Sequence, residues 1–78
     1  MSTSDLAAHI NKLMDMGIEE DDGVLVDELI TASCRPNYAK FEELAEFGFS
    51  VGPGERDSFG WLSGVVTRKS DGAAVIFG

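Results

Sequence analysis

The C-terminal stretch from Phe59 to Gly78 constrains the fold most, because it carries the densest apolar run in the chain. A polar break, Arg68 to Gly72, interrupts it, and Asp71-Gly72 is a strong turn signal because glycine adopts positive φ without steric cost. The runs on either side, Trp61 to Thr67 and Ala73 to Phe77, are rich in valine, isoleucine and aromatic residues, as strands are. We therefore expect an antiparallel β-hairpin at the C-terminal end of this sequence.

This hairpin is apolar on both faces. A loop of two or of four residues gives the same face assignment, because the two registers differ by an even number of residues. One face then carries Leu62, Val66, Val75 and Phe77, and the other carries Trp61, Val65 and Ile76. A hairpin of this kind is not stable alone in water, so helices, another strand or a partner must cover it.

Three helices are predicted before the hairpin from apolar residues at helical spacing and from capping signals. Their expected ranges are 4–16, 22–33 and 36–47. Ser2 or Ser4 can cap the first helix, and Gly17 and Gly48 follow the first and third helices as C-terminal stop signals. Val24 to Val26 is also compatible with a short strand, because two of its three residues are β-branched.

A short strand is expected at Phe49 to Val51, followed by an exposed loop from Gly52 to Asp57. The fold class predicted from these elements is α+β. Three short helices pack on one face of a C-terminal antiparallel sheet of two or three strands, and which hairpin face meets them stays open. The 78 residues are enough for one small domain, with a helical part at 1–48 and a β-hairpin part at 49–78.

Charge is distributed unevenly along the chain. Fourteen acidic residues against six basic ones give a net charge of −8. Residues 1–50 hold eleven of the acids and three of the bases, so they carry the whole −8, and residues 51–78 are neutral. Such a field repels nucleic acid and anionic membranes and attracts basic protein surfaces. We therefore expect neither direct nucleic-acid binding nor membrane binding.

Residue patterns typical of enzymes and metal sites are missing from the sequence. The single histidine, His9, and the single cysteine, Cys34, fall on different predicted elements, and no GxSxG or GxxxxGK[ST] motif occurs. Aligning Gly23 with the glycine of a calcium loop puts Ile18 and Leu29 where carboxylates are required. The sequence therefore predicts no catalytic residues, no metal site and no cofactor. A lone cysteine and the absence of a signal-peptide pattern or a spanning apolar segment predict a cytoplasmic protein.

The leading hypothesis is a non-enzymatic inhibitor or adaptor that binds a basic surface of another protein, in particular a nucleic-acid-binding one. Carboxylates can take the place of phosphates, because arginine and lysine pair with either group. The partner-binding residues proposed from the sequence are Glu19, Glu20, Asp21, Asp22, Asp27, Glu28, Glu42, Glu43 and Glu46. The alternative is that these side chains form a solvated face that keeps the protein soluble.

A second hypothesis is a small apolar interaction or oligomerisation module. In that case Trp61, Val65 and Ile76, on the second face of the hairpin, make the contact with a partner or with another copy of the chain. The observation behind it is that both hairpin faces are apolar.

The segment Ile10 to Ile18, INKLMDMGI, resembles the first helix and the Met-Gly-Phe loop of ubiquitin-associated domains. The resemblance implies that Met16, Gly17 and Ile18 contact the apolar patch of ubiquitin. It covers about nine of the 78 residues, and Ile18 replaces the phenylalanine of that family. The predicted second helix is longer than in that family, whose members carry no such hairpin. The chain is also similar in size and acidity, without any shared motif, to the small acidic inhibitors that phages and plasmids direct against host nucleic-acid-binding defence enzymes.

Overall fold

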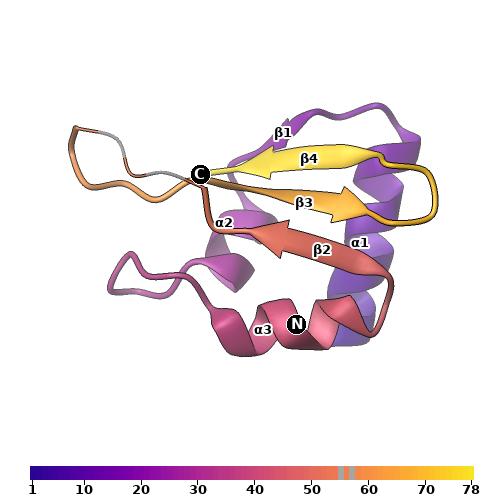
Figure 1. Ribbon diagram of the computed structural model, residues 1–78, viewed down its shortest axis with the longest axis horizontal. Coiled ribbons are helices and arrows are strands. Elements are labelled where there is room, and N and C mark those ends of the chain that lie inside the picture. The colour runs from indigo at the N-terminus through magenta and orange to yellow at the C-terminus, as the bar shows by residue number, and fades with distance from the viewer. Residues whose placement is uncertain (55, 57) are drawn as a thin grey trace.

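The computed structural model describes residues 1–54, 56 and 58–78, and in these residues three helices accompany one four-stranded sheet (Figure 1). The helices are α1 (Thr3–Asp15), α2 (Val24–Leu29) and α3 (Tyr38–Ala45). The strands are β1 (Glu20–Asp21), β2 (Phe49–Gly52), β3 (Gly64–Arg68) and β4 (Ala74–Phe77). The predicted α+β class with a C-terminal hairpin, formed by β3 and β4, is confirmed.

Helix α1 has both of the predicted end signals. The Ser2 hydroxyl accepts a hydrogen bond from the Asp5 amide at 3.1 Å, which satisfies an N–H group that has no partner within the helix. At the other end Gly17 has φ of 74°, and the Ile18 amide donates to the Leu13 carbonyl at 3.0 Å. This six-residue closure is a Schellman motif, which lets the chain leave the helix with its last carbonyls satisfied.

Helix α2 is shorter than the predicted 22–33, since it begins at Val24 and ends at Leu29. Ile30 has an extended backbone and forms an isolated antiparallel bridge with Pro36. Thr31 to Arg35 form a tight loop, in which the Thr31 amide donates to the Arg35 carbonyl at 2.8 Å. Pro36 excludes the helical conformation at Arg35, and the early stop leaves room for α3 to pack beside α2.

Helix α3 begins after Asn37, whose side-chain oxygen accepts from the Lys40 amide at 3.3 Å. The Asn37 side-chain amide also donates to the Glu28 carbonyl at 3.1 Å. One asparagine thus caps the start of α3 and ties it to the end of α2, which explains why α3 begins later than the predicted Pro36.

The sheet has the strand order β1-β4-β3-β2, with β1 parallel to β4 and the other pairs antiparallel. Strand β1 was not predicted, and with it the sheet is mixed and has four strands, where two or three antiparallel strands were expected. Helix α3 lies alongside β2 at one edge, and β1 forms the other edge (Figure 1).

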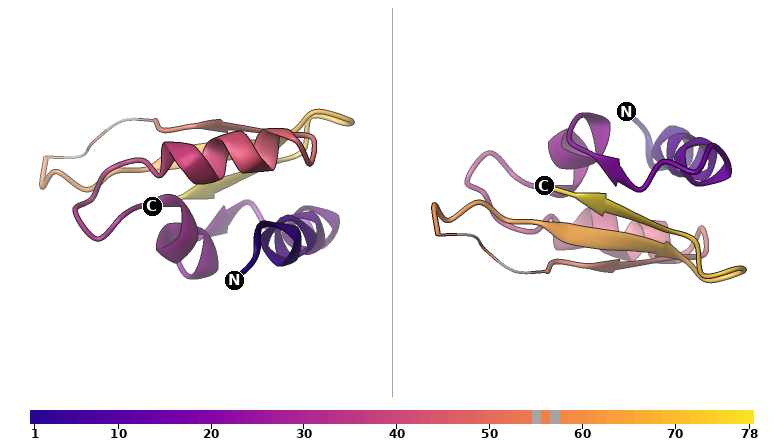
Figure 2. Two further views of the ribbon diagram at one scale, coloured as in Figure 1. Left: turned by 90° about the horizontal axis from the view of Figure 1, so that it is seen from below. Right: turned by 90° about the horizontal axis from the view of Figure 1, so that it is seen from above.

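Helices α1 and α2 lie against one face of the sheet, and no described helix covers the opposite face (Figure 2). Leu62, Val66, Val75 and Phe77 are buried on the helical side, as predicted for one hairpin face. They join Leu6 and Ile10 of α1, Leu25 and Leu29 of α2, Leu44 of α3 and Phe49 of β2 in one apolar core. The question of which hairpin face meets the helices is thereby settled.

Candidate protein-binding surfaces

The nine acidic residues proposed from the sequence lie on different parts of the molecule. Seven are exposed, and the two partly buried ones are Asp21 and Glu28. Glu19 to Asp22 lie at the β1 edge of the sheet, whereas Glu42, Glu43 and Glu46 belong to α3 and its C-cap, alongside β2 at the opposite edge (Figure 1). Six of the seven exposed carboxylates therefore form two separate groups, which we name the β1-edge acids (Glu19, Glu20 and Asp22) and the α3 acids (Glu42, Glu43 and Glu46). The seventh, Asp27, lies on α2.

Asp21 and Glu28 make contacts that hold the fold together. The Asp21 carboxylate accepts from the amides of Gly23, at 3.2 Å, and Leu25, at 3.1 Å, and so caps the start of α2. The Glu28 carboxylate lies 3.6 Å from the N-terminal amino group of Met1. Both groups are thus occupied with partners inside the chain.

We name the face of the sheet that no described helix covers the open face, and one row of paired residues crosses it from β1 to β2. The pairing aligns Glu20 with Ile76, Ile76 with Val65, and Val65 with Gly52. Ile76 is 50% exposed, and Val65 is partly exposed. The row is therefore apolar along most of its length and ends in a carboxylate at the β1 edge.

Trp61 does not continue this row. Strand β3 begins at Gly64, and Trp61 instead lines a cavity of about 330 Å³ together with Val26, Asp27, Ile30, Thr31, Ala32 and Cys34. The cavity lies between α2, the loop after it and the segment before β3. Sequence reasoning placed Trp61 with Val65 and Ile76 because it extended the strand pairing three residues too far.

Arg56 joins Cys34, which lines this cavity, to Gly60, the residue before Trp61. Its guanidinium donates to the Gly60 carbonyl at 2.7 Å and to the Cys34 carbonyl at 2.6 Å. Cys34 adopts φ of 55°, in the left-handed region. The sequence gave no signal for this contact, because the two segments that it joins are 22 residues apart.

A second hollow, of about 320 Å³, runs between α3 and β2. Tyr38, Phe41, Ala45 and Val51 supply apolar walls, and the polar side chains at its rim include Glu42 and Lys69. Tyr38 is mostly exposed there and meets the ring of Phe41 edge to face, with ring centroids 5.6 Å apart. One of the α3 acids thus borders an apolar groove.

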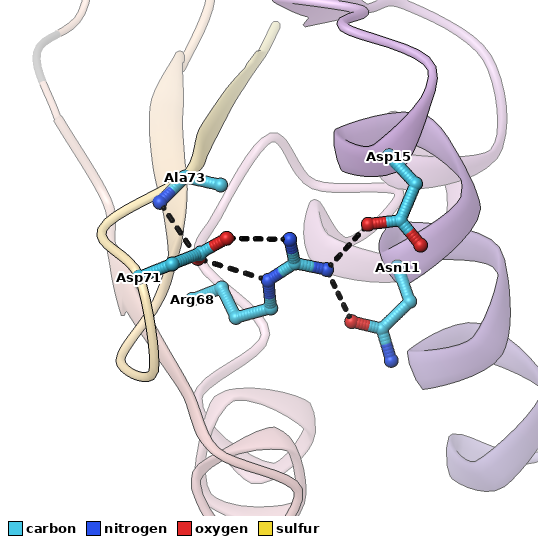
Figure 3. A network of polar contacts seen from close by, with 5 residues as sticks. All are labelled: Asn11, Asp15, Arg68, Asp71 and Ala73. Carbon is cyan, nitrogen blue, oxygen red and sulfur yellow. Dashed lines mark hydrogen bonds and ion pairs between the residues drawn. The ribbon is translucent and has the colours of Figure 1, made fainter.

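Arg68, at the end of β3, ties the hairpin to α1 through a set of polar contacts (Figure 3). Its guanidinium binds the Asp71 carboxylate at 2.7 and 3.0 Å and reaches across to Asn11 and Asp15 of α1, each at 3.0 Å. The hydrogen bond with Arg68, aided by the Ala73 amide, lowers the pKa of Asp71 from its ordinary 3.8 to about 2. The sequence marked Asp71 only as a turn residue.

The three residues that resemble the loop of ubiquitin-associated domains lie at the end of α1. Met16 is 63% exposed, and Gly17 is exposed beside it. Ile18 packs partly buried against the core and takes part in the Schellman closure. The local conformation of this segment is therefore explained by helix termination.

The described residues contain no group of three or more histidine, cysteine or acidic side chains placed to hold a metal ion. None of their helices has the length and apolar character needed to span a bilayer.

Comparisons with protein-family models, with curated proteins and with solved structures find no match to this chain.

Proposed function

We propose that this protein is a non-enzymatic binding protein that docks onto another protein through the open face of its sheet. The observation that carries the proposal is the row formed by Glu20, Ile76 and Val65, which is open to solvent and apolar except at the β1 edge. A matching partner surface has an apolar patch next to basic groups. Burying the apolar row supplies affinity, and the β1-edge acids orient the partner.

Charge favours a different protein over a second copy of this chain. Each copy carries −8, so two copies repel each other, whereas a basic surface is attracted. The single thiol, Cys34, suits a reducing compartment, and we place the interaction in the cytoplasm.

A tagged form of the protein, incubated in cell lysate, tests the proposal with three variants. The first replaces Val65 and Ile76 with threonine, which keeps β-propensity and removes apolar surface. The second replaces the β1-edge acids, and the third the α3 acids, with their amides, so that the two remove equal charge. We expect a specific protein to be retained by the wild type and the α3 variant and lost with the other two variants.

Equal retention by all three variants would show that neither the open face nor the β1 edge takes part. Recovery of the chain alone, with dimers in sedimentation, would assign the open face to self-association. Washing at about 0.05 M and about 0.5 M salt separates the two contributions, because salt screens exposed charges and leaves apolar contacts intact.

Phosphate mimicry is the second candidate, favoured by the seven exposed carboxylates. In this form the protein blocks a nucleic-acid-binding partner, as the inhibitors of phages and plasmids do. It requires that an added nucleic acid compete with the protein for the recovered partner. It also requires that the variant without the α3 acids bind the partner at least as weakly as the variant with threonine at Val65 and Ile76. Docking through the open face predicts the opposite order.

A further inference from the structure

We infer that the cavity between α2 and Trp61 binds an arginine side chain presented by the partner protein. The inference deepens the proposed function and relies on it only for the source of the arginine. The feature behind it is the combination of one carboxylate, one indole ring and an apolar wall around a single cavity.

The cavity has the chemical groups that recognise a guanidinium. Asp27 is exposed at the cavity, and its carboxylate makes no hydrogen bond or ion pair with any other described residue, so its charge is available. Trp61 is 43% exposed and presents an indole, the aromatic group that attracts cations most strongly. Val26, Ile30 and Ala32 supply apolar surface for the methylene stem of the ligand.

Arginine fits this combination better than lysine. A guanidinium is planar, stacks on an aromatic ring and pairs with a carboxylate in a forked geometry, whereas an ammonium is a compact and strongly hydrated charge. Arg56, a neighbouring cation, is bound to the backbone carbonyls of Cys34, which lines the cavity, and of Gly60, which precedes Trp61. Its guanidinium is therefore engaged with backbone carbonyls, and the Asp27 carboxylate is left to the incoming side chain.

The chain contains one tryptophan and one cysteine, and both line the cavity. Trp61 fluorescence consequently reports on a wall of the cavity, and alkylation of Cys34 puts a bulky group into the cavity. The probe is N-acetyl-arginine amide, and its matched control is N-acetyl-citrulline amide, which keeps the shape of the side chain and lacks the charge. We expect a saturable change in fluorescence with a dissociation constant on the order of 1 mM for the arginine probe.

Four results are expected. Citrulline amide binds at least about fivefold more weakly, because it lacks the charge that pairs with Asp27 and stacks on Trp61. Asp27→Asn weakens arginine binding by about fivefold, and Asp5→Asn, the same charge change in the first turn of α1 and outside the cavity, leaves it unchanged. Alkylated Cys34 abolishes the response. Trp61→Phe, followed through the amide resonances of Asp27 and Cys34, weakens binding about threefold.

The inference is overturned if citrulline amide binds as well as the arginine probe, if Asp27→Asn behaves like Asp5→Asn, or if the response shows no saturation up to about 50 mM. A failure of this kind leaves the docking of the open face intact, since that face is tested with the Val65 and Ile76 variant. Conversely, loss of partner binding only in the Asp27 variant would assign recognition to the cavity in place of the open face.

Discussion

Asp21 shows how one acidic residue of the N-terminal half serves the fold. Its carboxylate accepts hydrogen bonds from the backbone amides of Gly23 and Leu25 at the start of α2. The carboxylate of its neighbour Asp22 is exposed and makes no hydrogen bond or ion pair with any other described residue. Sequence reasoning assigned both to one acidic surface. The structure separates them because Asp21 is the last residue of β1 and its carboxylate caps the start of α2, whereas Asp22 follows the strand and is exposed.

Replacing Asp21 with alanine should therefore lower the free energy of unfolding by about 0.5–2 kcal/mol, the usual effect of losing a helix cap. Asp22→Ala removes the same charge from the adjacent position and should change stability by less than about 0.5 kcal/mol. Urea denaturation of both variants measures the difference. Equal losses would mean that net charge, and not the cap, sets the contribution of this segment.

Asp71 gives the hairpin a dependence on pH. Its pKa is lowered to about 2 in the folded protein from an ordinary 3.8, because Arg68 and the Ala73 amide bind the ionised form. A lowered pKa means that the interaction stabilises the fold fully above about pH 4 and is lost as the pH falls through about 2.

We expect the wild type to be more stable than Asp71→Asn at pH 6, with the gap narrowing as the pH falls toward 2. Denaturation of both proteins across this range measures the gap, and the chemical shift of the Asp71 carboxyl carbon reports its pKa directly. A gap that stays constant with pH, or an Asp71 carboxyl that titrates near 3.8, would contradict the contact with Arg68 in solution.

At the scale of elements, the sheet depends on close approach at Gly64. A Cβ at this position would lie 2.6 Å from the ring of Phe77 and against the Gly52 carbonyl oxygen. Both neighbours are fixed, since Phe77 is fully buried and Gly52 belongs to β2. Only glycine therefore lets β2, β3 and β4 come together here.

Gly64→Ala should lower the free energy of unfolding by about 1–3 kcal/mol through overpacking. Gly52→Ala is the matched control in the paired strand, because its added Cβ would meet only the Val65 side chain at an ordinary 3.8 Å. That control should change stability by less than about 0.5 kcal/mol. Thermal unfolding of the two variants compares them, and an unperturbed Gly64→Ala would show that the strands are packed less tightly than described.

Local sequence signals predicted elements well wherever they agreed with the tertiary packing. Gly17 ended the first helix as expected, and alternation in the hairpin gave the buried side of Val66 and Val75 correctly. The signals failed where distant contacts decided the outcome. Glu20 and Asp21 have low β-propensity and form a strand only because β4 offers them an edge, so no local pattern announces β1.

The candidate sites were predictable to a smaller extent than the fold. Alternation identified Val65 and Ile76 as a separate apolar pair, and the structure places both on the open face. The cavity beside Trp61 depends on the early end of α2 and on Arg56, which acts across 22 residues. Composition gave the number of carboxylates, whereas the strand order decided that the β1-edge acids and the α3 acids lie at opposite edges of the sheet.

At the scale of the whole molecule, the net charge of −8 acts on a fold with a maximum extent of 33 Å. Like charges this close repel one another, and repulsion is stronger in the compact state than in the unfolded chain. Added salt screens this repulsion within a Debye length of about 10 Å at 0.1 M. Salt also weakens the few ion pairs, such as Arg68 with Asp15, so the two effects oppose each other.

Repulsion should dominate, because eleven acids face only three bases in residues 1–50. Raising sodium chloride from about 0.01 M to about 0.5 M is therefore expected to stabilise the protein by about 1 kcal/mol, or about 4–8 °C in melting temperature. The variant with amides in place of the β1-edge acids should gain less from the same salt, since part of the repulsion is already gone. A wild type that loses stability on adding salt would mean that specific ion pairs outweigh the net charge. The role of the β1-edge acids in attracting a basic partner would then need a direct measurement of association rates at varied ionic strength.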